Sequence, residues 1–351
     1  MGPRFLVTGA TGFIGRRVVD RLLEEFGAHS LVCLTKPPAT PLEAEIADAY
    51  RGRGLRLIEA DMRNSPLAAD PPPSVSTVFH LAANVNTDAS AQEACVNDLG
   101  TQHLLDWLQP AAPGMRIVYA STVAVHDRDS HPVGAINEDS PLVPRTEYGR
   151  SKLRGERIIQ ARAARDGFTW TILRLPTVYG PGQKPGGLFD RLIAGTAAGA
   201  WPARIDWPGR TSILHVDDAA AIMIDLAARP DAGGEVYCVA SESLTVGELA
   251  ARIAERSGHP TRMAAIGPQL LRIARAVVWN PALLSLLPTA ARRACWRLSL
   301  MVSDGFWFDT TKFRAAYSRP LRSIDEGLAE MLQEARGAGL LPLRGKGLVG
   351  C

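Results

Sequence analysis

The chain has 351 residues, of which 46% are hydrophobic and 21% are charged, a balance that excludes a disordered chain, a collagen-like chain and a small disulfide scaffold. Its net charge of +3 gives no general signal for nucleic-acid binding. The cysteines are scattered without a C-x-x-C pair, no secretory signal is recognised, and no apolar run reaches membrane-spanning length. These features favour free thiols in a cytoplasmic, reducing compartment.

Short apolar runs alternate with amphipathic stretches through the first two thirds of the chain. Runs typical of buried strands occupy 5–7, 31–34, 55–58, 75–81, 116–120 and 169–173, and helical spacing marks 14–26, 90–108 and 147–166. Strands that alternate with helices predict an α/β fold with a doubly wound parallel sheet of the Rossmann type. Further helices are expected at 217–228 and 246–257.

A charge bias marks the C-terminal third. Residues 256–303 contain seven arginines and no acidic residue, and Pro281 and Pro288 are expected to divide this window into short helices. Arginine on short amphipathic helices suits an anionic membrane surface, so the window is a candidate for peripheral membrane contact. Core packing is the alternative explanation for the tryptophans in this part of the chain.

A glycine-rich sequence follows the first predicted strand and opens the first predicted helix. In TGATGFIG, Gly9 permits a tight turn, Gly12 lets the backbone approach a pyrophosphate, and Gly15 lets the helix pack closely on the strand. The helix N-terminus then offers N–H groups to the phosphates. In this strand–turn–helix context the pattern predicts dinucleotide binding.

A candidate acid/base pair lies in the predicted helix 147–166. Tyr148 and Lys152 are four residues apart, so phenol and ammonium share one helix face, and the cation favours the phenolate. Ser121 and Thr122 follow the strand 116–120, and ligands of open α/β sheets bind at such strand ends. A hydroxyl at this strand end can hydrogen-bond the substrate oxygen.

The G-x-x-G-x-x-G spacing and the Ser/Thr–Tyr–Lys set resemble the extended branch of the short-chain dehydrogenase/reductase superfamily, the NAD(P)-dependent epimerase/dehydratase family. Segments 80–83, 175–182, 215–220 and 308–312 match this family in order, so the resemblance spans about residues 4–330. It implies Ser121, Tyr148, Lys152 and Asn97 as catalytic residues and a C-terminal strand at 308–312. It also implies a homodimer through helices 90–108 and 147–166.

The resemblance further implies a cofactor site formed by the glycine turn and the strand ends around it. Its predicted members are Gly9, Thr11, Gly12, Phe13, Ile14, Gly15, Lys36, Asp61, Met62, Leu81, Ala82, Ala83, Tyr148, Lys152, Leu175, Pro176 and Val178. Thr35 and Lys36 stand where a carboxylate would select NAD, which favours NADP, with NAD as the alternative. No metal site is expected.

The substrate is expected to be a small molecule rather than a nucleic acid, and two classes are weighed. Thr211 stands where nucleotide-sugar epimerases carry an arginine, and Val123 counts against a dehydratase, whereas the Trp- and Arg-rich C-terminal part favours an apolar substrate. The main prediction is hydride transfer to or from a hydrophobic carbonyl or alcohol. A nucleotide-sugar epimerase is the alternative, and a non-catalytic NADP-binding sensor is the second. Predicted substrate contacts are Asn84, Thr122, Tyr179 and Arg210.

Three regions are therefore expected along the chain. Residues 1–175 form the NAD(P)-binding core, and 176–335 form a smaller, mainly substrate-binding region whose late elements return to the core. Residues 336–351 form a tail.

Overall fold

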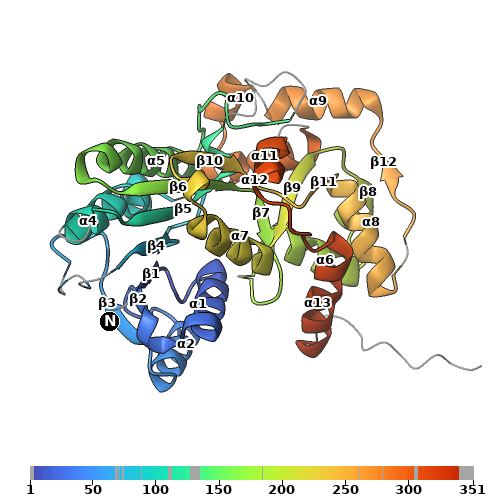
Figure 1. Ribbon diagram of the computed structural model, residues 1–351. Coiled ribbons are helices and arrows are strands. Elements are labelled where there is room, and N and C mark those ends of the chain that lie inside the picture. Colours follow the sequence, from blue (N-terminus) through green and yellow to red (C-terminus); the bar gives the residue numbers. More distant parts are fainter. Residues whose placement is uncertain are drawn as a thin grey trace, which may run out of the picture.

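The computed structural model describes residues 4–67, 70, 72, 75–87, 89–109, 113–126, 135–183, 185–259, 261–278, 280–303 and 307–339. Its centre is a seven-stranded sheet in the order β10-β6-β5-β4-β1-β2-β3, with parallel pairing throughout (Figure 1). This arrangement confirms the predicted Rossmann-type fold. The strands are β1 (Phe5–Thr8), β2 (Leu31–Thr35), β3 (Arg56–Glu59), β4 (Thr77–His80), β5 (Arg116–Thr122), β6 (Thr169–Leu175) and β10 (Glu235–Cys238).

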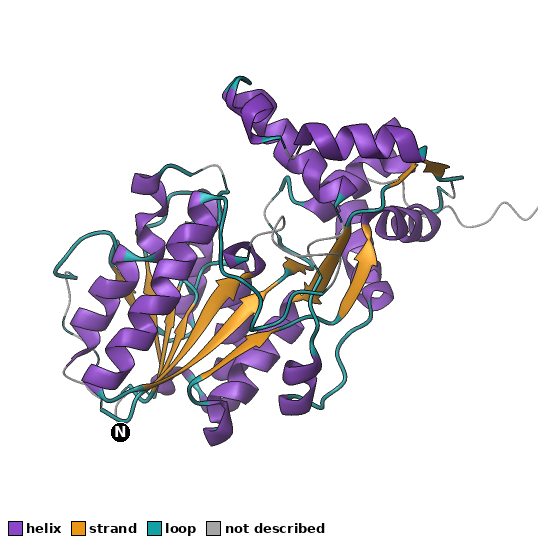
Figure 2. Ribbon diagram, turned by 90° about the horizontal axis from the view of Figure 1, so that it is seen from above, coloured by secondary structure: helices purple, strands orange, loops and turns teal. Residues whose placement is uncertain are grey.

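Both faces of the sheet are covered by helices (Figure 2), and for that reason β1, β2 and β4 are buried at every position. Successive side chains of a strand point to opposite faces, so Phe5 and Val7 of β1 enter one core while Leu6 enters the other. The first core contains residues of α1 (Phe13–Phe26), α2 (Pro41–Gly52) and α7 (Val216–Ala228). The second contains residues of α4 (Leu99–Leu108) and α5 (Glu147–Asp166).

Two predicted elements differ from the structure. The stretch predicted as one helix over 90–108 is divided into α3 (Ala91–Ala94), η2 (Cys95–Asn97) and α4, because the Asp98 carboxylate caps a new helix by accepting the N–H of Leu99. The implied strand at 308–312 is wrong: Phe308 forms a single bridge to Ile136, and α12 (Thr311–Ala316) starts directly afterwards. Helix α2, capped by Thr40, has no counterpart among the predicted elements.

The second half of the chain forms a smaller layer beside the main sheet, and β10 interrupts it to pair with β6 of the main sheet. Strands β7 (Thr177–Tyr179), β9 (Arg210–His215) and β11 (Glu242–Thr245) make a three-stranded sheet, and β8 (Ile205–Asp206) pairs with β12 (Ala264–Ala265). They are accompanied by α6 (Leu188–Ala197), α8 (Val246–Ser257) and α13 (Ile324–Gly337). The predicted tail at 336–351 begins within the last turn of α13, and 340–351 lie outside the described residues.

The acid-free window folds into three helices, as its prolines predict. Helices α9 (Pro268–Val278), α10 (Pro281–Ser285) and α11 (Thr289–Val302) form an arm at one end of the molecule (Figures 1 and 2). Pro281 opens α10 and Pro288 precedes α11, positions at which the missing proline N–H does not interrupt a helix. Among the described helices, none has the length and apolar content needed to cross a bilayer.

Candidate functional site

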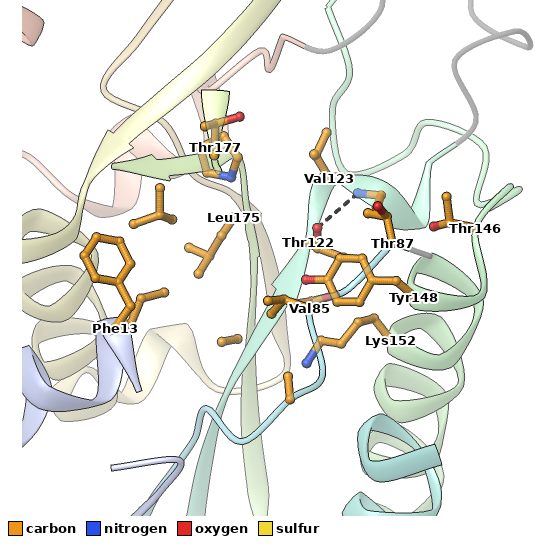
Figure 3. Close-up of a pocket in the computed structure, with 18 of the residues that line it drawn as sticks. Phe13, Val85, Thr87, Thr122, Val123, Thr146, Tyr148, Lys152, Leu175 and Thr177 are labelled. Carbon is orange, nitrogen blue, oxygen red and sulfur yellow. Dashed lines mark hydrogen bonds between the residues drawn. The ribbon is translucent and has the colours of Figure 1, made fainter. Parts of the chain in front are cut away.

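A cavity of about 750 Å³ lies where β1, β4, β5 and β6 end, between the main sheet and the smaller layer. This is the place where open α/β sheets bind ligands. Figure 3 shows Tyr148 and Lys152 on one side of the cavity and Phe13 and Leu175 on the other. Fourteen predicted site residues line it: Gly9, Gly12, Phe13, Ile14, Gly15, Leu81, Ala83, Ser121, Thr122, Tyr148, Lys152, Leu175, Pro176 and Val178.

The glycine turn forms one wall of this cavity. Gly9 has a positive φ of 66°, and a Cβ there would lie 2.8 Å from the backbone of Ala82, so only glycine fits the turn. Helix α1 begins after Gly12 with no side-chain cap and no acidic residue in its first turn. Its N-terminal N–H groups and partial positive charge therefore suit an anionic group such as a pyrophosphate.

Tyr148 and Thr122 meet inside the cavity. Thr146 caps α5 by accepting the N–H of Gly149, which places Tyr148 in the first turn of the helix, facing the end of β5. Burial raises the pKa of the Tyr148 phenol, and the neighbouring Thr122 hydroxyl opposes only part of that rise. The Thr122 hydroxyl also accepts the N–H of Ala124 at 3.2 Å, the dashed line in Figure 3.

Lys152 lies one turn further along α5 and is almost fully buried, at 1% exposure. Its ammonium lies 3.9 Å from the centre of the Tyr119 ring and has no hydrogen-bond partner among the described residues. Burial lowers the pKa of Lys152 to about 7, and the charge of Glu156 partly opposes that shift. A buried ammonium without an acceptor fits the hydroxyls of a nicotinamide ribose, so this wall accommodates a dinucleotide.

Ser121 occupies a different environment from its neighbour. Its hydroxyl donates to the carboxylate of Glu156, which also forms a buried ion pair with Arg174 at 2.9 Å. Both residues line the cavity, but the Ser121 hydroxyl is engaged by Glu156, whereas the Thr122 hydroxyl lies on the wall that Tyr148 shares. Sequence reasoning missed Glu156, although it stands four residues after Lys152 on the same helix face.

Asn97 and Asn84 hold a loop rather than line the cavity. The Asn97 side chain accepts the N–H of Asn84 at 2.8 Å and donates at 3.0 Å to both the Asn84 carbonyl and the Ser151 hydroxyl. The Asn84 amide donates in turn to the Glu93 carbonyl. Both asparagines therefore position this loop, whose Val85 and Thr87 line the cavity, and the catalytic role of Asn97 and the substrate contact of Asn84 stay predictions.

The remaining predicted substrate contacts also lie off the cavity. Tyr179 is fully buried, stacks on Phe189 at 4.4 Å between ring centres, and donates its hydroxyl to the Ser323 carbonyl, and it is not among the residues that line the cavity. The Arg210 guanidinium lies 5.4 Å from the centre of the Trp307 ring, and the next residue, Thr211, lines the cavity.

Sequence reasoning missed the part of the wall that faces the smaller layer. It includes four residues of the acid-free window, which no local pattern links to the glycine turn. The missed residues are Val123, Ala124, His126, Arg145, Thr146, Thr177, Gln183, Gly187, Thr211, Val278, Leu284, Ser299 and Leu300.

The residues predicted to bind the adenosine half lie beyond the cavity. The Lys36 ammonium lies 3.4 Å from the Glu43 carboxylate, which also accepts the N–H of Ala39 at 2.8 Å. Hydrogen bonds from Arg63 lower the pKa of Asp61. The other predicted cofactor contacts outside the cavity wall are Thr11, Met62 and Ala82.

Comparison with known proteins identifies the family. The model of the NAD dependent epimerase/dehydratase family matches residues 5–240. The chain belongs to this family. It is 30% identical over 272 residues to sterol demethylase protein B of Methylococcus capsulatus, covering 76% of this chain and 78% of the relative. It is also 30% identical over 271 residues to a UDP-glucose 4-epimerase of Mycolicibacterium smegmatis, covering 73% and 83%.

Among solved structures, MoeE5 in complex with UDP-glucuronic acid and NAD superposes with a TM-score of 0.69 at 26% identity, covering 95% of this chain and 99% of that one. The extended short-chain dehydrogenase/reductase resemblance is therefore confirmed. So is the predicted enzyme class, because the relatives that this chain matches include dehydratases and epimerases of this NAD-dependent family.

Proposed function

We propose that this family member transfers hydride between a nicotinamide cofactor and an alcohol or carbonyl carbon, with Tyr148 exchanging the proton on the substrate oxygen. The observation that carries the proposal is that Tyr148, Thr122 and the unpartnered Lys152 line one cavity together with the glycine turn. A bound nicotinamide supplies or accepts the hydride. Tyr148 holds the proton, Thr122 hydrogen-bonds the oxygen, and Lys152 binds a ribose hydroxyl and lowers the phenol pKa.

Thr122, rather than Ser121, is assigned to the substrate oxygen, and paired variants test this. Thr122→Val is expected to lower kcat by about 10- to 100-fold while the dissociation constant of NADH changes little, because it removes a donor to the reacting oxygen. Ser121→Ala is expected to lower Tm with a smaller change in kcat, because Glu156 loses a buried hydrogen bond. A large loss of kcat in Ser121→Ala, with little loss in Thr122→Val, would assign the substrate oxygen to Ser121 instead.

The cavity favours an apolar substrate. Its substrate side is formed by residues such as Val278, Leu284 and Leu300, and its charged side chains among the described residues are Lys152 and Arg145. An apolar wall stabilises an apolar ligand by removing it from water. The likeness to sterol demethylase protein B points in the same direction.

A nucleotide-sugar epimerase is the second candidate. The UDP-glucose 4-epimerase relative and the MoeE5 complex with UDP-glucuronic acid favour it, and the comparisons support it better than the apolar class. Assays with NAD against a panel of long-chain and sterol alcohols, and against UDP-glucose and UDP-glucuronic acid, separate the two. We expect NADH formation with an apolar alcohol. Interconversion of sugar nucleotides without net NADH, and no reaction with any apolar alcohol, would establish the epimerase instead.

For the cofactor, we propose NAD rather than the NADP that the sequence favours. The charge of Lys36 is paired with Glu43, and a carboxylate at this strand end repels a 2′-phosphate and accepts a ribose 2′-hydroxyl. The NAD in the MoeE5 complex agrees with this choice. NADH is expected to bind more tightly than NADPH in calorimetric titrations. Glu43→Ala is expected to bring the dissociation constants of the two cofactors closer together. Tighter binding of NADPH to the wild type would restore the original prediction.

A further inference from the structure

The outer face of α9 and α10 carries a row of exposed apolar side chains. Leu270, Ile273 and Val277 follow the i, i+3, i+7 spacing of one helix face, and the first two are 62% and 61% exposed. Leu286, just after α10, is 81% exposed, and Leu283 belongs to the same row. Five large apolar residues exposed within 17 positions form a patch of the kind that marks an interaction surface.

The inner face of the same helices holds the arm in place. Leu271, Ala274 and Val278 of α9 pack on the core of the smaller layer. The Arg275 guanidinium donates to the Val302 carbonyl of α11 at 2.7 Å, which fixes α9 against α11. The outer row is therefore separate from the contacts that fold the arm.

The charge of the window that holds the patch is of one sign. Arg272 is exposed between Leu270 and Ile273 on α9, and Arg262 is exposed six residues before α9 begins. Residues 256–303 contain seven arginines without an acidic residue, and of these Arg256 pairs with Asp325 outside the window. A two-fold contact with a second copy would place arginines of one copy against those of the other, with no carboxylate of the window to pair them. An anionic lipid surface, by contrast, accepts apolar side chains and attracts arginine.

We propose that α9 and α10 dock the enzyme on an anionic lipid bilayer, with Leu270, Ile273 and Leu286 inserted among the lipids. Val278 and Leu284 of the same two helices line the cavity, so the docking face and the cavity wall are two sides of one arm. Docking places that wall next to the bilayer, from which an apolar substrate partitions into the cavity. This last step rests on the proposed apolar substrate, whereas docking does not.

Co-sedimentation of the full chain with vesicles tests the proposal. We expect binding to vesicles of phosphatidylcholine with phosphatidylglycerol, little binding to phosphatidylcholine alone, and release in high salt. The triple variant L270S/I273S/L286S is expected to bind the vesicles at least about tenfold more weakly than the wild type, because it loses the inserted apolar area. Leu42→Ser, which removes an equally exposed leucine from α2 (58%), is the matched control and is expected to bind like the wild type.

The Tm and the NADH dissociation constant of each variant are measured beside those of the wild type, and unchanged values show that the variant keeps its fold. Equal sedimentation of the triple variant and the wild type, or no sedimentation of the wild type, would overturn the proposal. A wild-type dimer in light scattering that the triple variant dissociates would also overturn it, since a second copy would then cover the patch. Turnover in vesicle-free buffer is a separate readout, so loss of docking and loss of the proposed hydride transfer are distinguishable.

Discussion

Tyr148→Phe is expected to lower turnover by about 10²- to 10⁴-fold, the usual contribution of a positioned acid/base group. The change keeps the ring that lines the cavity and removes only the phenol hydroxyl on the wall that Thr122 shares. Binding of NADH, followed by calorimetry, should change by less than about threefold, because the phenylalanine leaves the glycine turn and Lys152 in place.

The matched control for this variant is Tyr179→Phe. Tyr179 is also a buried tyrosine with a hydrogen-bonded hydroxyl, but it lies in the core beside Phe189 rather than on the cavity. Its variant should keep turnover within about twofold and lose a little stability. Turnover that survives in Tyr148→Phe on every accepted substrate would remove Tyr148 from proton transfer.

Lys152→Met is expected to move turnover and stability in opposite directions. Turnover should fall by about 10²-fold or more, because the phenol loses the cation that lowers its pKa and the ribose loses a donor. The cofactor-free protein should become more stable, because methionine fills similar space without burying an ammonium that has no acceptor.

The stability gain has a definite pH dependence. The pKa of Lys152 is lowered by burial from 10.5 in the unfolded chain to about 7 in the fold. Between these values the unfolded chain binds the extra proton, so wild-type stability falls as pH falls from about 10.5 to about 7 and changes no further below that. The advantage of Lys152→Met is therefore largest at pH 6, on the order of 5 kcal/mol for a pKa lowered from 10.5 to about 7, and shrinks as pH rises to 10.

Thermal unfolding without cofactor at pH 6 and pH 9.5 measures this difference. The surface control is Lys312→Met, since Lys312 is about half exposed and pairs with Glu235, and its Tm should change little at either pH. A Lys152→Met variant less stable than the wild type at pH 6 would mean that the ammonium has a favourable partner in the free protein.

The parts of the site fixed by local chemistry were predictable from the sequence. A glycine turn needs three glycines in one short stretch, and Tyr148 and Lys152 share a face because they are four residues apart on one helix. Helix 147–166 was predicted with its observed bounds from its helical spacing, and the structure shows Thr146 and Gly167 capping its two ends. Resemblance to the family then supplied the order of the strand ends around them.

The parts that depend on packing between distant segments were not predictable. Whether Ser121 or Thr122 faces the phenol is decided by Glu156 and Arg174, which come from α5 and β6. The sequence does not show that the Asn97 side chain hydrogen-bonds the backbone of Asn84, because the two residues meet only in the folded chain. The wall supplied by α9–α11 comes from residues more than 120 positions after Tyr148, and no periodicity connects them.

A crystal structure of the protein with NAD tests the central claim most directly, namely that the glycine turn and the Tyr148–Lys152 pair form one site. The account predicts dinucleotide density in the cavity, with phosphates against the first N–H groups of α1 and Lys152 Nζ about 2.7–3.2 Å from a ribose oxygen. NAD bound elsewhere, or bound in the cavity with Lys152 still lacking an acceptor, would contradict it.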